Sequence, residues 1–297
     1  MLNDNFKGHL AAITANIFFG LNISVAKALF SSSWMTPIGL TITRMSFGFA
    51  MFWIISFFRP REKIAKKDLL VIAAGSFLGL AFSQITFTAA LLYTTPVIIS
   101  LIAALSPIIV LLLSALFLKD PLSYKKTIGV VVGISGALLI VIRNNAGGIS
   151  VDSVWGTLLA FISVTSYASY LVIIRKTAAR YSPVTMMKWM YLFSLILLAP
   201  FGFPELPKQR IFTSGTSLLP WLELGYVLLF STILAFFLTP VALKRIKATT
   251  VSMYINLQPL VASTAAIAIG QDFFSWDKPL ALILIVAGVF LVTRRDA

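Results

Sequence analysis

The sequence predicts an all-α integral membrane protein with ten transmembrane helices, and three observations support this fold class. The chain has 297 residues, of which 59% are hydrophobic and only 11% are charged, and its mean hydropathy is +0.94. A soluble domain carries about 25% charged residues, so this chain lacks the polar side chains that a water-exposed surface requires. Apolar runs of about 18 or more residues recur along it, and this length crosses a bilayer as a helix.

The spans follow from the apolar runs and the charged or Pro/Gly/Ser-rich breaks between them. We expect them at 8–30, 37–58, 68–92, 97–118, 124–142, 152–174, 183–203, 217–243, 248–269 and 279–293. The connections are short, so no soluble domain is expected. No small-residue cleavage site follows the first run, which therefore reads as a retained helix rather than a signal peptide.

The distribution of basic residues predicts the orientation. With the N-terminus inside, 17 of the 24 Lys and Arg residues fall on inner segments and 4 on outer segments. Cytoplasmic loops carry such an excess, so both termini are expected in the cytoplasm. The same loops account for the net charge of +14, and no nucleic-acid partner is expected.

Several activities are disfavoured by what the chain lacks. It has no cysteine and a single histidine, His9, and its ten acids do not cluster, so we expect no metal site, no cofactor and no catalytic residues. It also lacks a nucleotide-binding Walker motif. An integral-membrane enzyme is therefore disfavoured, as is a channel, because no ring of charges marks a filter.

One pattern occurs twice. "SPIIVLLLSALFLKD" (Ser106–Asp120) returns 152 residues later as "QPLVASTAAIAIGQD" (Gln258–Asp272), so that Pro107 matches Pro259 and Asp120 matches Asp272. Further upstream the register shifts by four residues. We expect repeats at 1–147 and 148–297, each with five spans. Since five is odd, the second repeat enters the membrane inverted, an arrangement typical of secondary transporters with alternating access around a central cavity.

These residues resemble the drug/metabolite transporter superfamily, in its ten-helix EamA-type branch. The resemblance is carried by "FFGLNISVAK", by "AALLYTTPVIISLIAALSP" through "LFLKDPLSYKKTIGVVVGISGALLIV", and by the second copy "VALKRIKATTVSMYINLQP" through "IAIGQDFFSW". The family usually has glutamate where this chain has Asp120 and Asp272. Within the superfamily the chain is most similar to the bacterial aromatic amino-acid exporters (YddG type). The resemblance implies two interleaved five-helix bundles in a bacterial inner membrane.

Polar and small residues along the spans are candidates for contact with a substrate. They are Asn16, Gly20, Gln84, Thr88, Ser100, Ser166, Tyr167, Tyr170 and Asn256. Polar groups inside a bilayer usually face protein or water. The alternative is packing between helices, which uses the same small and hydroxyl residues.

Prolines and charges within the spans carry further hypotheses. Pro107 and Pro259 each remove a helical hydrogen bond, and we expect kinks with a mechanical role in gating. Arg44 and Lys27 are possible charge partners of a substrate. The alternatives are snorkelling or carbonyl contacts for Arg44 and snorkelling to the headgroups for Lys27. Asp120 and Asp272 lie at helix ends, where a structural role is expected.

The sequence thus predicts an exporter of small neutral metabolites, foremost aromatic or other hydrophobic amino acids. Among the acids only Glu223 lies inside an apolar run, so a uniporter is favoured and proton antiport through Glu223 is the alternative. A second alternative is an exporter of anionic metabolites of the sugar-phosphate or nucleotide-sugar class, which would require several basic residues in the cavity. The expected partners are a small-molecule substrate and membrane lipids, and the expected state is a monomer.

Overall fold

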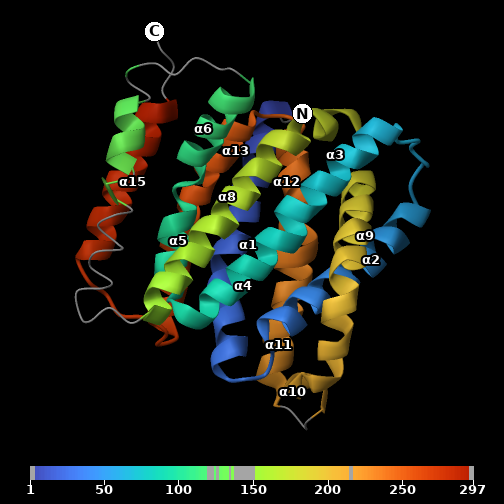
Figure 1. The fold of residues 1–297 in the computed structure, drawn as a ribbon, viewed down its shortest axis with the longest axis horizontal. Coiled ribbons are helices and arrows are strands. Elements are labelled where there is room, and N and C mark those ends of the chain that lie inside the picture. Colours follow the sequence, from blue (N-terminus) through green and yellow to red (C-terminus); the bar gives the residue numbers. More distant parts are fainter. Residues whose placement is uncertain are drawn as a thin grey trace.

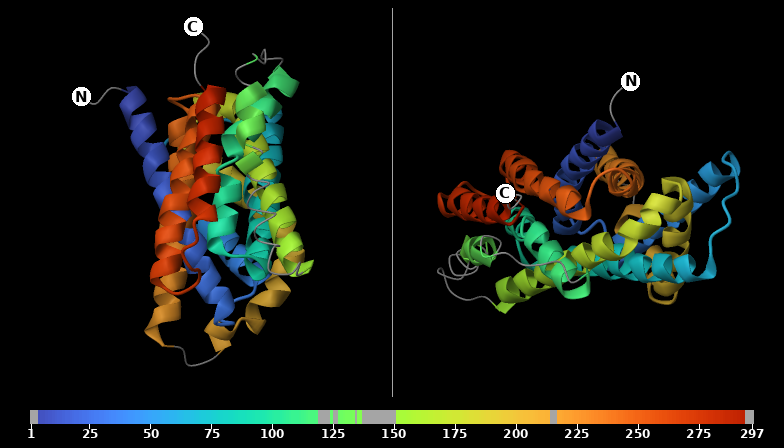
Figure 2. Two further views of the ribbon diagram at one scale, coloured as in Figure 1. Left: turned by 90° about the vertical axis from the view of Figure 1, so that its left-hand side faces the viewer. Right: turned by 90° about the horizontal axis from the view of Figure 1, so that it is seen from above.

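A computed structural model describes residues 4–118, 124, 127–133, 135–136, 151–213 and 217–293. Every regular element in these ranges is helical, and no strand occurs among them. The long helices run side by side (Figures 1 and 2). The elements are α1 (Asp4–Ser31), α2 (Pro37–Phe57), α3 (Lys66–Ser76), η1 (Phe77–Phe82), α4 (Ser83–Tyr93), α5 (Pro96–Ala103), α6 (Ser106–Leu118), α8 (Val151–Arg180), α9 (Pro183–Gly202), η2 (Phe203–Lys208), α10 (Arg210–Thr213), α11 (Leu218–Tyr226), η3 (Val227–Ala235), α12 (Phe236–Leu243), α13 (Ala248–Met253), η4 (Tyr254–Leu257), α14 (Gln258–Ala268) and α15 (Asp277–Thr293).

Eight helical segments among the described residues are long and apolar enough to cross a membrane. They are Asp4–Ser31, Pro37–Phe57, Lys66–Tyr93, Pro96–Leu113, Val154–Arg180, Pro183–Lys208, Leu218–Leu243 and Ala248–Ala268. A shorter apolar stretch, Lys278–Gly288, lies in α15. The predicted span 124–142 lies largely outside the described residues, so the ten-helix count stays a prediction. The chain is a multi-pass membrane protein.

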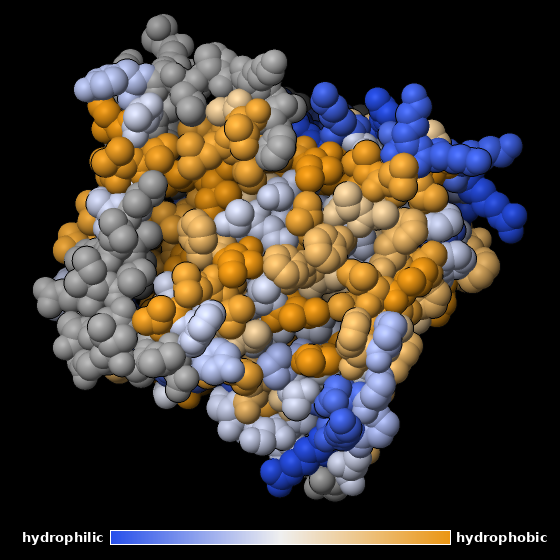
Figure 3. All heavy atoms as spheres, in the orientation of Figure 1, coloured by the Kyte–Doolittle hydropathy of each residue, from blue (hydrophilic) through white to orange (hydrophobic). Residues whose placement is uncertain are grey.

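The outer surface is apolar over most of the face in Figure 3, with hydrophilic residues gathered toward its ends. Many large apolar side chains are exposed on the surface of the bundle, and Leu116 and Phe201 are each 72% exposed. A water-soluble protein rarely leaves so much apolar surface uncovered, whereas lipid tails cover it at no cost. The start of α1 and the end of α15 lie at the same end of the molecule (Figures 1 and 2).

Three helices begin at a Ser/Thr-Pro pair. Thr36, Thr95 and Ser182 each accept a hydrogen bond from a backbone NH of the first turn of α2, α5 and α9, and a proline follows each of them. The hydroxyl satisfies an NH that has no partner within the helix, and proline at the first helical position loses no bond. The pair therefore fixes where each helix begins.

Two helix interruptions lie 152 residues apart. Ala104 and Leu105 form a turn between α5 and α6, and the 3-10 segment η4 separates α13 from α14. Pro107 and Pro259 are each the second residue of the helix that follows its interruption. The prolines therefore restart a helix rather than bend a continuous one, although their predicted role in gating is not tested by this arrangement.

Two π-helical segments are related in the same way. The shift of 152 residues places η1 (Phe77–Phe82) on residues 229–234, which lie inside η3 (Val227–Ala235). Each segment interrupts a long membrane helix just before residues that line the central cavity described below. A π-helical turn adds a residue to the turn and is frequent at functional sites.

Each end of the helix bundle is held by a contact between the two sequence repeats. At one end the Thr36 NH donates to Gln209 Oε1 at 2.7 Å, and at the other the Ser182 NH donates to Glu62 Oε2 at 3.0 Å. We call these the Gln209 contact and the Glu62 contact. Each contact binds the residue just before a helix, Thr36 before α2 and Ser182 before α9. The two contacts lie at opposite ends of the bundle, which are far apart in Figure 1.

Candidate functional site

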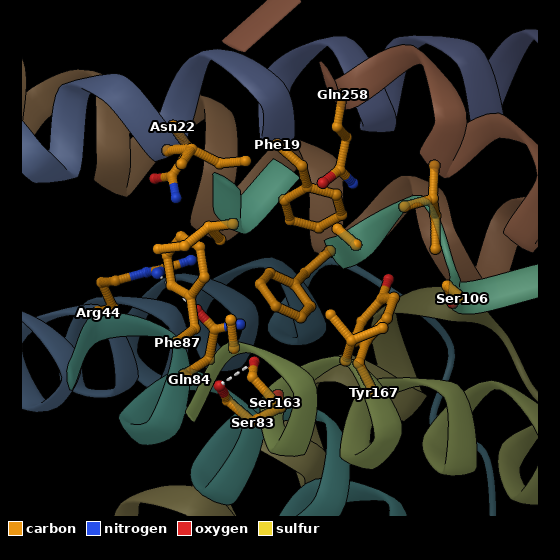
Figure 4. A pocket seen from close by; sticks show the side chains of 17 residues that line it. Phe19, Asn22, Arg44, Ser83, Gln84, Phe87, Ser106, Ser163, Tyr167 and Gln258 are labelled. Atoms are coloured by element: carbon orange, nitrogen blue, oxygen red, sulfur yellow. Dashed lines mark hydrogen bonds between the residues drawn. The ribbon is translucent and has the colours of Figure 1, made fainter. Parts of the chain in front are cut away.

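A central cavity lies between helices from both repeats. It holds about 650 Å³ of empty space, counted up to and including its open side. Its lining consists of Phe19, Asn22, Ile23, Arg44, Ser83, Gln84, Phe87, Ile99, Ala103, Ser106, Ala160, Ser163, Val164, Tyr167, Phe236, Ile255 and Gln258. Figure 4 shows these side chains converging from several helices.

The lining is built from matched positions of the two repeats. Gln84 and Phe236 lie 152 residues apart and each follows a π-helical segment. Ala103 and Ser106 flank the first helix interruption, while Ile255 and Gln258 occupy the positions 152 residues later, around the second. In each repeat, therefore, the helix interruption and the π-helical segment lie next to the cavity.

Aromatic and aliphatic side chains share the apolar wall, and the aromatic ones are Phe19, Phe87, Tyr167 and Phe236. The Phe19 ring lies edge-on to Phe236 at 5.0 Å between centroids and to Tyr167 at 6.3 Å. Phe87 enters the cavity near them (Figure 4). Edge-on and offset arrangements are favourable for aromatic pairs, so a ligand ring fits among these side chains by the same interactions.

Arg44 is the charged residue of the lining. Its side chain is almost fully buried, at 1% exposure. Nε donates to Thr232 Oγ1 at 2.8 Å, Nη1 to Gln84 Oε1 at 2.6 Å and Nη2 to Ser231 Oγ at 3.2 Å. The guanidinium carbon lies 5.9 Å from the centroid of the Phe236 ring. Every one of these partners is neutral, so they orient the guanidinium without neutralising it.

The remaining polar groups divide into bonded and unbonded ones. Ser163 donates to the Ser83 carbonyl at 2.8 Å, and Gln258 Nε2 donates to Asn16 Oδ1 at 2.8 Å. Asn22 Oδ1 and Ser106 Oγ are buried without a hydrogen-bond partner. Buried polar atoms are rarely left unpaired, and two of them beside a cavity are available to a ligand. Among the described residues no group of three or more His, Cys, Asp and Glu side chains lies together as a metal site would require.

Comparison with known proteins identifies the family. The profile of the EamA-like transporter family matches residues 6–142 and again residues 154–294. The chain belongs to the EamA-like transporter family. Because the match occurs twice, the protein carries a duplicated EamA domain. The expected repeat boundaries, 1–147 and 148–297, stay a prediction.

Relatives in the EamA-like family extend over nearly the whole chain. An uncharacterized transporter of Archaeoglobus fulgidus is 23% identical over 278 residues, covering 94% of this chain and 95% of that protein. The uncharacterized transporter YcxC of Bacillus subtilis is 26% identical over 293 residues, covering 95% and 91%. A solved crystal structure matches with a TM-score of 0.65 at 20% identity, over 95% of this chain and 98% of that one, which shows the shared fold. The names of the Archaeoglobus and Bacillus relatives call them transporters and give no substrate.

Of the predicted substrate residues, the structure brings Gln84 and Tyr167 to the cavity. Asn16 lies behind the wall and accepts the bond from Gln258. The other candidates lie outside the lining: Gly20, Thr88, Ser100, Ser166, Tyr170 and Asn256.

Bonds within a helix or contacts between helices account for most of these other residues. Ser100 and Thr88 donate to carbonyls one turn earlier in their own helices, and Ser166 donates to the Leu78 carbonyl at 2.7 Å. Tyr170 is fully buried against Gly79, where an added Cβ would lie 2.5 Å from its ring. Asn256 lies in η4, and its Oδ1 is buried without a partner.

The charged candidates also separate. Arg44 neither snorkels nor binds carbonyls, contrary to the alternative considered for it, because it is held by side-chain oxygens inside the bundle. Lys27 does make carbonyl contacts, with Leu91 at 2.5 Å and Thr94 at 3.2 Å, and lies outside the cavity lining. Glu223 is half-buried in α11 and does not line the cavity either.

Of the two aspartates expected to have a structural role, Asp120 and Asp272, the structure describes only Asp272. Asp272 forms an ion pair with Lys278 at 2.6 Å and accepts a bond from the Phe273 NH at 2.8 Å. Both contacts are local to the connection before α15 rather than between bundles. Asp120 lies outside the described residues.

The sequence reasoning missed Asn22, Ser83, Ser106 and Gln258 as cavity residues. The candidates predicted on α1 were Asn16 and Gly20, whereas the cavity meets the neighbouring face that carries Phe19 and Asn22. A signal was available in the repeat itself, because Ser106 and Gln258 occupy matched positions 152 residues apart, each just before one proline of the repeated pair.

Proposed function

We propose that the protein is a secondary transporter that exports small metabolites with a polar head and an apolar body, foremost aromatic or other hydrophobic amino acids. The observation that carries this proposal is the composition of the central cavity, in which aromatic and aliphatic side chains lie beside amide, hydroxyl and guanidinium groups. Sites for small molecules commonly combine an apolar wall with a small number of placed polar groups. Membership of a transporter family supports transport rather than an enzymatic reaction.

Alternating access is the mechanism that the arrangement supports. Two EamA domains in inverted orientation would present equivalent ends to the two sides of the membrane. The Gln209 contact and the Glu62 contact fit this scheme, because each joins one repeat to the other at one end and binds the residue just before a helix. We propose that each contact opens in turn while the cavity stays central.

Uniport is the simplest energetic scheme. Glu223, the acid considered for proton antiport, does not line the cavity, and no other acid among the described residues does. Proton coupling through the site would require a titrating carboxylate within reach of the substrate. Export then follows from the substrate gradient out of a producing cytoplasm. Because the cavity lining comes from one chain, a monomer in the inner membrane with cytoplasmic termini is sufficient.

Counterflow in proteoliposomes tests the proposed function. Vesicles loaded with unlabelled phenylalanine should accumulate external radiolabelled phenylalanine above the level of empty vesicles, and a protonophore should leave this uptake unchanged. Unlabelled tryptophan or methionine should compete. Absence of counterflow with folded protein would overturn the amino-acid assignment, and inhibition by the protonophore would favour proton antiport.

A further inference from the structure

We propose that Arg44 binds the carboxylate of the substrate, so that the carrier selects molecules with a single negative head group and an apolar body. This inference rests on the proposed function, because it takes the central cavity as the substrate site. It goes further by assigning one residue to one chemical group and by setting the charge of that group.

The first argument is that the charge of Arg44 has no counterpart. The guanidinium is 1% exposed, and the ion pairs among the described residues all lie elsewhere. Burying a charge away from water costs free energy, and this cost is not offset when no opposite charge lies nearby. A group that supplies a negative charge at this place therefore binds with a large electrostatic gain.

The second argument is the number of donors. A guanidinium carries five N–H groups, and the three bonds to Thr232, Gln84 and Ser231 each use one. One N–H on each terminal nitrogen thus remains without a described partner. Carboxylates commonly accept one bond from each of two such groups, which gives direction as well as strength.

The third argument is that the surrounding side chains hold Arg44 in place. Thr232 Oγ1 accepts from Arg44 Nε and donates to the Val227 carbonyl at 2.8 Å, a bond across the π-helical segment η3. The Tyr191 hydroxyl donates to the Thr232 carbonyl at 2.5 Å. The guanidinium is therefore oriented before a ligand arrives, and binding costs little side-chain entropy.

The fourth argument sets the class of ligand. Arg44 is the one charged side chain among the described residues that line the cavity, so it matches one negative charge. A phosphate ester brings close to two charges and would leave one of them uncompensated in an apolar site. The rings of Phe19, Phe87 and Phe236 then accommodate the apolar body (Figure 4). Monocarboxylates, amino acids among them, fit this combination.

The test compares carboxylates with the matching amides, in which the carboxylate is replaced by an uncharged group. Purified wild type, Arg44→Gln, Arg44→Lys and the control Lys27→Gln are titrated with 3-phenylpropionate, 3-phenylpropionamide, phenylalanine and phenylalaninamide, and affinity is read from ligand-induced thermal stabilisation. The wild type and Lys27→Gln should bind each carboxylate about 10- to 100-fold more tightly than its amide, as expected for a charge-assisted bond. Arg44→Gln should lose this preference, and Arg44→Lys should retain only part of it because it lacks the planar fork.

Two results would overturn the proposal: no carboxylate preference in the wild type, or an unchanged preference in Arg44→Gln. If Arg44→Gln does not fold, an unchanged preference in Arg44→Lys overturns it instead. Together with the counterflow experiment, this binding test distinguishes failure of the role of Arg44 from failure of the proposed function. Phenylalanine counterflow with an Arg44-independent preference removes only the role of Arg44. An Arg44-dependent preference for 3-phenylpropionate without phenylalanine counterflow supports the role of Arg44 and removes only the amino-acid assignment.

Discussion

At the scale of single residues, two membrane-embedded cations have different environments. Lys27 lies against the carbonyls of Leu91 and Thr94, at the C-terminal end of α4, where the helix dipole favours a positive charge. Arg44 instead bonds the hydroxyl and amide oxygens of side chains, and none of these bonds goes to the carbonyls of a helix end. Lys27 therefore fastens one helix to another, whereas Arg44 keeps an uncompensated charge beside the cavity.

Asn22 offers a second residue-scale test, because its Oδ1 is buried beside the cavity without a partner. Replacing an unsatisfied buried amide by an apolar group of similar size is nearly neutral or stabilising. We expect Asn22→Leu to keep or raise the unfolding midpoint, and to weaken binding of phenylalanine relative to 3-phenylpropionate by about 10-fold if Oδ1 accepts the ammonium group. Equal weakening of both ligands would contradict this role.

Gly20 was predicted to contact the substrate, and the structure gives it a packing role. A Cβ at this position would lie 2.9 Å from Val261 Cβ and 3.2 Å from Gln258 Cα, so α1 and α14 would have to separate. Gly20→Ala should lower the free energy of unfolding by about 1–3 kcal/mol. The matched control is Gly225→Ala, where nothing lies within 4 Å and the change should be neutral or stabilising by up to about 1 kcal/mol. Denaturation in detergent measures both, and equal effects would contradict the packing argument.

At the scale of elements, the two end contacts use different chemistry. The Gln209 contact is made by an amide that does not titrate, while the Glu62 contact is made by a carboxylate. Partial burial of Glu62 opposes its ionisation, but the bonds from the Ser182 NH and from the Thr185 and Ser182 side chains outweigh this, helped by the charge of Lys244. The pKa of Glu62 therefore lies below its ordinary value of 4.5.

A carboxylate with a lowered pKa stabilises the folded state above its unfolded pKa, and this contribution is lost as the pH falls through the folded pKa. We therefore expect the wild type to be more stable than Glu62→Gln at neutral pH, and this difference to shrink once the pH drops below about 4.5. Thermal unfolding of both proteins between about pH 7 and pH 3 measures it. A difference that does not change with pH would show that the charge of Glu62 contributes nothing to the contact.

The interruptions of the helices differ in how well the sequence announces them. Pro107 and Pro259 mark the breaks before α6 and α14, because proline cannot donate the bond that a continuous helix needs. The π-helical segments η1 and η3 carry no comparable residue, since "FLGLAF" and "VLLFSTILA" read as ordinary apolar helix. No residue in them marks the change of helix type, so the sequence alone did not reveal them.

At the scale of the whole molecule, the fold class followed from composition and run length, because lipid accepts only segments whose backbone groups are bonded internally. The doubled domain followed from the pattern around Pro107 and Pro259. The cavity lining was harder, because polar residues on helices serve packing and binding alike. Which face of α1 meets the cavity depends on the rotation of the helix against its neighbours, and the stripe through Asn16 and Gly20 turned toward α14 instead.

The central claim, that one cavity opens to each side in turn, is tested most directly by the accessibility of that cavity. The chain has no native cysteine, so Ser163→Cys places a single thiol in the lining. In sealed proteoliposomes of known orientation, a membrane-impermeant thiol reagent is applied from either face. The same is done after Thr36→Cys and Gln209→Cys, or Glu62→Cys and Ser182→Cys, are first joined as a disulfide by mild oxidation, which leaves the isolated thiol at position 163 free to react.

The account predicts that the thiol introduced by Ser163→Cys reacts from both faces, and that each crosslink abolishes labelling from one face while leaving the other. Phenylalanine should slow the reaction from either side by occupying the cavity. Labelling from a single face only, or crosslinks that leave labelling unchanged at both faces, would contradict alternating access through the two end contacts.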